Sequence, residues 1–107
     1  MNNSHVVEVG EHNFDAEVAQ ADVPVIVDFG ATWGAPCKAL APVVEAIAKE
    51  GEGRVKVVAV DIEEAPALAK RFAVSGVPTL IVFKKGEATA RHVGVASKAK
   101  LIDLVGL

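Results

Sequence analysis

The sequence VIVDFGATWGAPCKALAPVVEAIAK, residues 25–49, decides the fold expected for this chain. It opens as an apolar run interrupted by Asp28, passes through a turn of small residues, and continues with apolar residues at the spacing of one helix face. The residues on that face are Cys37, Leu40, Ala41, Val44 and Ala48. The stretch therefore predicts a buried strand that leads through a tight turn into a helix, with the only cysteine of the chain in the first part of that helix.

Two prolines set the shape expected for this helix. Pro36 suits the first helical turn, where its missing N–H would have no intrahelical partner in any case. Pro42 falls in the helix interior, where it removes a backbone hydrogen bond, so we expect it to bend the helix axis.

The rest of the chain alternates predicted strands with predicted helices. Strands are expected at Val6–Val9, Arg54–Asp61, Leu80–Phe83 and Thr89–Val95, and helices over Phe14–Ala19, Glu63–Phe72 and the segment after Ser97. Asn13 and Ser97 are of the residue types that cap helix N-termini, and Lys84–Glu87 has hairpin chemistry. The order βαβαβαββα predicts an α/β fold with a central, largely parallel sheet covered on both faces, and an antiparallel pair at one edge.

Composition and charge narrow the class of function. A chain of 107 residues with 51% apolar content has the size and composition of one globular domain, residues 1–107. The formal net charge of −3 gives no electrostatic case for a nucleic-acid partner. No apolar segment is long enough to span a membrane, and the first residues lack the pattern of a signal peptide. We therefore expect a cytoplasmic protein with no membrane association.

The quoted stretch and the element order together resemble the thioredoxin family. The active-site segment of that family is an apolar strand with a buried aspartate, followed by Trp-Cys-Gly-Pro-Cys-Lys. Asp28, Trp33 and the run Pro36-Cys37-Lys38 match this segment position by position. The resemblance extends from Val6 to Val105 and implies the thioredoxin fold, a central five-stranded mixed sheet flanked by four helices.

A second match lies at Gly76-Val77-Pro78-Thr79-Leu80, which resembles the family segment whose proline is cis and lies against the active-site turn. A cis Val77–Pro78 bond is therefore expected. The resemblance also implies a docking face for protein or peptide partners, where the Val77 backbone pairs with an extended segment. The residues of this docking face would be Trp33, Gly34, Ala35, Pro36, Val77, Pro78 and Gly94.

Three positions of the active-site segment depart from the family pattern. Gly34 stands where the family has its nucleophilic first cysteine, Ala35 replaces the motif glycine, and Gly30 stands where the family often has a tryptophan. Cys37 is the only cysteine, so no intrachain disulfide can form. This chain therefore cannot hold a dithiol–disulfide couple of its own.

Cys37 and Asp28 are the candidate catalytic residues. Cys37 matches the family's second, resolving cysteine, and its place on the inward helix face favours a buried, slow thiol over a reactive one. Burial should raise the pKa of Asp28. Two roles stay open for that carboxyl: proton exchange with the thiol, as the resemblance implies, or a structural role with backbone N–H groups as partners. The lysine that the family often places nearby corresponds to Ala59.

These residues predict a thioredoxin-like protein in which ordinary dithiol–disulfide exchange is lost or strongly impaired and the docking face is retained. Two alternatives remain open: monothiol chemistry at Cys37, or an altered form of an ordinary dithiol thioredoxin, hence an active protein-disulfide reductase. We expect a monomer without a cofactor, with protein or peptide partners and thioredoxin reductase as a further candidate. The histidines His5, His12 and His92 lack metal-ligand spacing, so no metal site is expected.

Overall fold

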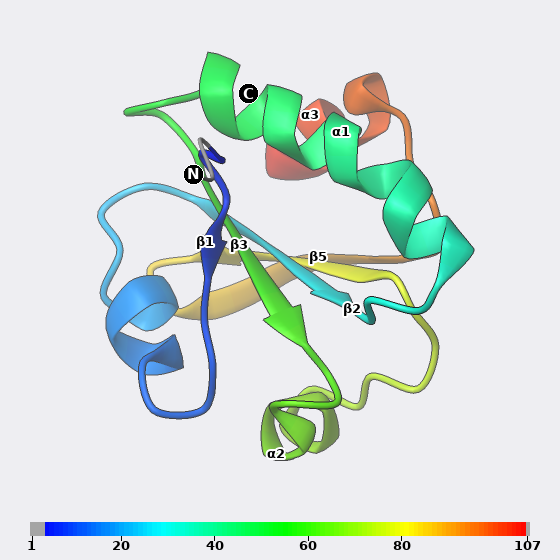
Figure 1. Ribbon diagram of the computed structural model, residues 1–107. Helices are drawn as coiled ribbons and strands as arrows, with labels where there is room; N and C mark the ends of the chain where they lie inside the picture. Colours follow the sequence, from blue (N-terminus) through cyan, green and yellow to red (C-terminus); the bar gives the residue numbers. More distant parts are fainter. Residues whose placement is uncertain (1–3, 107) are drawn as a thin grey trace.

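Five strands form one mixed sheet in the order β1-β3-β2-β4-β5 (Figure 1). This computed structural model describes residues 4–106, so residues 1–3 and 107 of the predicted domain lie outside the described part. The strands are β1 (Val7–Glu8), β2 (Val25–Gly30), β3 (Lys56–Asp61), β4 (Thr79–Lys84) and β5 (Glu87–Val93). β3 pairs in parallel with β1 and β2, and β4 pairs antiparallel with β2 and β5.

The sheet has more antiparallel pairing than the sequence led us to expect, because β4 runs antiparallel to β2. α2 (Pro66–Arg71) has six residues and covers about 9 Å, whereas a six-residue strand such as β3 covers about 20 Å. The connection that contains α2 does not return the chain to the opposite end of the sheet. β4 instead begins beside the end of β2, with Thr79 opposite Phe29, and runs in the reverse direction.

Helices cover both faces of the sheet (Figure 1). α1 (Ala35–Glu50) and α3 (Lys98–Val105) lie over one face, while α2 and η1 (Asp15–Ala19), a short π-helix, lie over the other. Each face has its own hydrophobic core. Ile26 of β2 packs in the core under α1, and Val25, Val27 and Phe29 pack in the core on the other side. Because successive side chains of a strand alternate between faces, Asp28 lies on the α1 side with Ile26.

The element ends differ from the predictions where local hydrogen bonds compete with regular structure. Asn13 does not cap η1, because its side-chain oxygen accepts the Gly10 N–H at 2.7 Å. Glu63 lies in a turn before α2, where its N–H donates to Asp61 Oδ1 at 2.9 Å. These side-chain bonds offer the backbone an alternative to the helical ladder, which is why both helices are shorter or later than expected.

Three local predictions agree with the structure. α1 contains Pro36 in its first turn and Pro42 in its interior. The hairpin between β4 and β5 turns through Lys85 and Gly86, whose φ angles are 52° and 83°. Ser97 caps α3, since its hydroxyl oxygen accepts the Lys100 N–H at 3.1 Å.

Replacing Ser97 with alanine should lower the free energy of unfolding by about 1 kcal/mol, because the Lys100 N–H would lose its capping acceptor. Urea unfolding followed by circular dichroism measures this difference. Ser75→Ala, at an exposed position outside the helices, is the matched control. An effect of equal size in both variants would show that the cap does not stabilise α3.

Candidate functional site

The first turn of α1 follows directly from a tight turn after β2. The Gly34 N–H donates to the Ala31 carbonyl at 3.2 Å, which closes that turn. Gly34 is the N-cap residue of α1 in an extended conformation, and its carbonyl accepts the Lys38 N–H at 3.1 Å. The predicted strand–turn–helix geometry is therefore present, with Trp33 exposed and Gly34 buried at the position where the family has its first cysteine.

The Cys37 thiol is half-buried. On the predicted inward face, Leu40, Val44 and Ala48 are buried, while Ala41 is exposed. The Cys37 sulfur lies toward Gly34 and Gly30: a Cβ added to either glycine would stand 3.2 or 3.5 Å from it. The thiol therefore sits at the edge of the core and not inside it, less deeply than its helical phase suggested.

Asp28 lies below this thiol with an unpaired carboxylate oxygen. Its Oδ1 atom is buried and has no hydrogen-bond partner within residues 4–106. Burial raises the pKa of Asp28 to about 6. The alternative in which backbone N–H groups satisfy this oxygen therefore has no support in the structure. The register of β2 and β3 places Ala59 beside Asp28, so the small residue inferred from the sequence is its neighbour.

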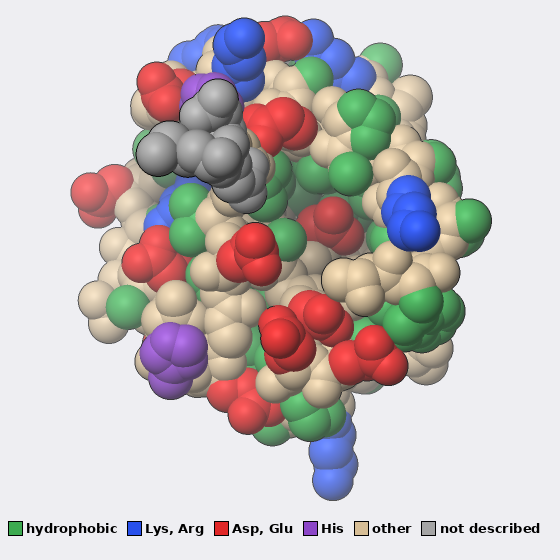
Figure 2. Space-filling model, in the orientation of Figure 1, with side chains coloured by type: hydrophobic (Ala, Val, Ile, Leu, Met, Phe, Trp, Pro, Cys, Tyr) green, Lys and Arg blue, Asp and Glu red, His purple; other side chains and the backbone are tan. Residues whose placement is uncertain are grey.

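A pocket of about 610 Å³ opens at this point, and we call it the Asp28 pocket. It is lined from three sides by the segment before and within β1, by the ends of β2 and β3 and by the first turns of α1. Its lining residues are Ser4, Val6, Glu8, Asp28, Gly30, Ala31, Thr32, Cys37, Lys38, Ala41, Pro42, Val44, Glu45, Ala59, Val60 and Asp61. Figure 2 shows the hollow on this face of the molecule, with acidic side chains in and around it.

The pocket was not predicted from the sequence, although two of the small residues that create it had been identified there. Gly30 and Ala59 are small side chains at the ends of adjacent strands, and both line the pocket. The strand pairing that brings them to either side of Asp28 is a tertiary feature, which strand patterns alone do not specify. The departures from the family tryptophan at Gly30 and from the family lysine at Ala59 were the available signals.

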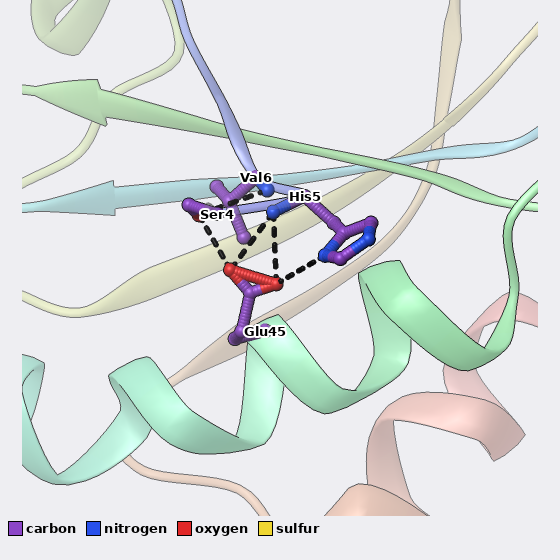
Figure 3. Close-up of polar contacts among 4 residues, drawn as sticks. All are labelled: Ser4, His5, Val6 and Glu45. Carbon is purple, nitrogen blue, oxygen red and sulfur yellow. Dashed lines mark hydrogen bonds and ion pairs between the residues drawn. The ribbon is translucent and has the colours of Figure 1, made fainter. Parts of the chain in front are cut away.

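The upper rim of the pocket is held by hydrogen bonds to Glu45 of α1 (Figure 3). The Glu45 carboxylate accepts the Ser4 hydroxyl at 2.5 Å and the His5 backbone N–H at 2.9 Å, and it contacts His5 Nδ1 at 3.2 Å. The hydrogen bond from Ser4, followed by those from His5, lowers the pKa of Glu45. The segment before β1 is therefore attached to α1 beside the pocket.

The residues of the predicted docking face lie at the end of the sheet where β2 ends and β4 begins. The Val77–Pro78 bond is cis, and the Gly94 N–H donates to the Pro78 carbonyl at 2.8 Å. Gly94 has a φ of 102°, a conformation that favours glycine. Trp33, Ala35 and Pro36 are exposed, Val77 and Gly94 are half-buried, and Gly34 and Pro78 are buried.

Two further apolar side chains extend this surface. Val93 is 60% exposed and Val95 50% exposed, next to Gly94, and Trp33 is 64% exposed. Large apolar side chains at such exposure mark a surface suited to partner contact when they gather. The sequence pattern included Val93 only as a neighbour of Gly94 and did not single out Val95, because an edge strand and a buried strand share similar valine content.

No group of three or more histidine, cysteine, aspartate or glutamate side chains within residues 4–106 is arranged to hold a metal ion. His5 contacts Glu45, and His92 Nε2 lies 3.4 Å from the Val95 carbonyl oxygen. In the same part of the chain, no helix combines the length and hydrophobicity needed to cross a membrane.

Comparison with known proteins agrees with this geometry. The thioredoxin family model matches residues 5–106. Thioredoxin C-2 of Corynebacterium nephridii is 44% identical over 100 residues, covering 94% of this chain and 93% of the relative. Thioredoxin 1 of Nostoc sp. is 42% identical over 98 residues, covering 92% of each chain, and thioredoxin of Pseudomonas aeruginosa is 40% identical over 97 residues, covering 91% and 90%. The chain therefore belongs to the thioredoxin family.

Proposed function

We propose that this protein binds an extended segment of a partner protein at its docking face and does not itself carry out dithiol–disulfide exchange. The observation that carries the proposal is the single thiol of the chain: Cys37 is its only cysteine. The family chemistry forms a mixed disulfide with one sulfur and resolves it with a second. Gly34 supplies no sulfur for the first of these steps.

The docking half of the proposal rests on features that need no sulfur. The Val77 N–H and C=O make no backbone hydrogen bond within residues 4–106, so both can pair with an extended partner segment. Trp33, Val93 and Val95 are exposed apolar side chains, and Val93 lies beside Gly76, the residue before Val77. An extended segment would gain main-chain hydrogen bonds at Val77 and apolar contacts on either side of it.

Docking is tested with an unfolded chain that has no free thiol, such as reduced and alkylated insulin B chain. We expect the amide signals of Val77 and Gly94 and the indole signal of Trp33 to shift in nuclear magnetic resonance titrations. Trp33→Ala should weaken the binding at least about fivefold, because exposed tryptophan is a frequent anchor of such contacts. Lys85→Ala, in the distant hairpin, is the control. Shifts located elsewhere, or equal binding by both variants, would contradict a docking face at this site.

One observation favours monothiol chemistry at Cys37 as a second candidate. The thiol is half-buried and lines an open pocket, so a small reagent can approach it. Native-state alkylation measures its accessibility. We expect Cys37 to react with iodoacetamide in the folded protein; labelling that requires a denaturant would remove this candidate.

A further inference from the structure

The Asp28 pocket has an acidic lining. Glu8, Asp28, Glu45 and Asp61 contribute carboxylates, and Lys38 is the cation among the lining residues. Glu45 is already engaged by Ser4 and His5, and Asp61 Oδ1 accepts the Glu63 N–H. Among the lining carboxylates, Asp28 and Glu8 are left without a hydrogen-bond partner within residues 4–106. This charge favours an occupant that carries a cation over one that carries a carboxylate.

The carboxylate at the base of the pocket has no cation beside it. No ion pair of Asp28 with a lysine or arginine is present within residues 4–106, and the neighbouring strand offers Ala59 at the same level. Oδ1 of Asp28 is buried without a hydrogen bond. A buried carboxylate without a partner is costly, so a cation of suitable size would relieve that cost on entering.

The single thiol is within reach of the same carboxylate. A Cβ added to Gly30 would stand 3.5 Å from Cys37 Sγ and 3.7 Å from Asp28 Oδ1. The two atoms therefore lie no more than about 7 Å apart, and the glycine places no side chain between them. In a two-carbon aminothiol joined to Cys37, the nitrogen would reach about 6 Å from Sγ, given a disulfide bond of about 2 Å. Its ammonium group could then donate to the Asp28 carboxylate.

We propose that the Asp28 pocket is a binding site for a small amine-bearing disulfide, which joins its aminothiol half to Cys37. The Cys37 thiolate attacks one sulfur of the ligand, a new S–S bond forms to Cys37, and the ligand's own S–S bond breaks. The other half leaves as a thiolate and takes up a proton from water. Cys37 is oxidised to the mixed disulfide and the departing half is reduced, so the ligand itself is the oxidant.

This site is separate from the docking face. None of Trp33, Gly34, Val77, Pro78 and Gly94 lines the pocket. The fold permits a partner to dock when the pocket holds no ligand, and it permits a ligand to bind in the pocket when no partner is docked. The proposal is therefore independent of docking; it rests on the second candidate, monothiol chemistry at Cys37, and the charge preference measured below tests it separately from the reactivity of Cys37.

The test compares three small disulfides that differ in charge: cystamine (cationic), hydroxyethyl disulfide (neutral) and dithiodipropionate (anionic). Each reacts with the folded full chain at about pH 7.5, where Asp28 with its pKa of about 6 is mainly ionised. Intact mass spectrometry follows the mixed disulfide, and a free cysteine derivative gives the reference rates. The cystamine preference of a thiol is the ratio of its rate with cystamine to its rate with hydroxyethyl disulfide. At low salt we expect this ratio for Cys37 to be about ten times the ratio for the free cysteine derivative.

Two pocket variants and one control locate the effect. Asp28→Asn removes the carboxylate charge, and Ala59→Lys places an ammonium group beside it; both should reduce the cystamine preference most of the way to the reference value. Glu52→Gln makes the same charge change at an exposed turn outside the pocket and should preserve the preference. Ala59→Lys keeps the test decisive if Asp28→Asn does not fold. Equal relative rates for the three reagents, no reaction of native Cys37, or an unchanged preference in both pocket variants would overturn the proposal.

Discussion

Replacing Gly34 with cysteine should give this chain protein-disulfide reductase activity. A Cβ added to Gly34 would stand 3.2 Å from Cys37 Sγ, and its next neighbours, the Ala31 carbonyl oxygen and Cys37 Cβ, would both be 3.7 Å away. In a disulfide, the Cβ of one cysteine lies about 3.0 Å from the sulfur of the other. The geometry at the start of α1 is therefore already close to that of a bonded pair, although glycine provides no sulfur.

The Gly34→Cys protein should form an intrachain disulfide on mild oxidation, measured by loss of two free thiols. It should reduce insulin with dithiothreitol as electron source at a rate at least about a hundredfold above the unaltered chain, because a nucleophile and a resolving thiol are then both present. Gly34→Ser, which adds an oxygen in place of the sulfur, is the matched control. A Gly34→Cys protein that forms the disulfide and remains inert would show that restoring the missing cysteine is not sufficient for catalysis by this chain.

Replacing Asp28 with alanine should stabilise the protein at neutral pH by up to about 3 kcal/mol. The folded-state pKa of about 6 lies above the ordinary value of 3.8, and each pKa unit corresponds to about 1.4 kcal/mol. The folded state binds a proton more tightly than the unfolded state. The contribution of the Asp28 proton equilibrium to the free energy of unfolding is therefore fully present below about pH 4 and is lost as the pH rises to about 6.

Urea unfolding of the native chain and Asp28→Ala between about pH 4 and pH 7.5 measures this effect. The difference in free energy of unfolding should grow across that range and approach zero at its acid end. Asp103→Ala removes a carboxylate from an exposed position on α3 and serves as the control. A difference that is independent of pH would mean that the burial of the Asp28 carboxyl does not control stability.

The element order followed from patterns that act within one segment. Apolar runs specified β2 and β4, helical spacing specified α1, and the hydroxyl of Ser97 and the turn at Lys85 and Gly86 specified two boundaries. The direction of β4 did not follow, because it depends on where the connection through α2 places the start of β4, which is a tertiary feature. The start of α2 was also predicted too early, at Glu63. The helix N-cap predicted at Asn13 was also wrong, because its side-chain oxygen accepts the Gly10 N–H instead.

The sequence predicted the chemical groups of the site better than the shape of the pocket that they line. An aspartate within an apolar strand implied burial and a raised pKa, and the structure has both. The Asp28 pocket and the half-buried Cys37 could not be predicted from the sequence, because both depend on the space left where Gly30 and Ala59 meet α1. A missing side chain creates no pattern along the chain, and its effect appears only when neighbouring strands are aligned.

A chain with one cysteine should not turn over a protein disulfide by dithiol exchange. The most direct measurement is the steady-state rate of insulin reduction at increasing concentrations of the unaltered chain, with dithiothreitol, or NADPH with thioredoxin reductase, as electron source. At every concentration of the chain, we expect the same rate of insulin reduction as with the electron source alone. A rate that rises in proportion to the chain, with many disulfides reduced per molecule, would contradict the loss of dithiol exchange.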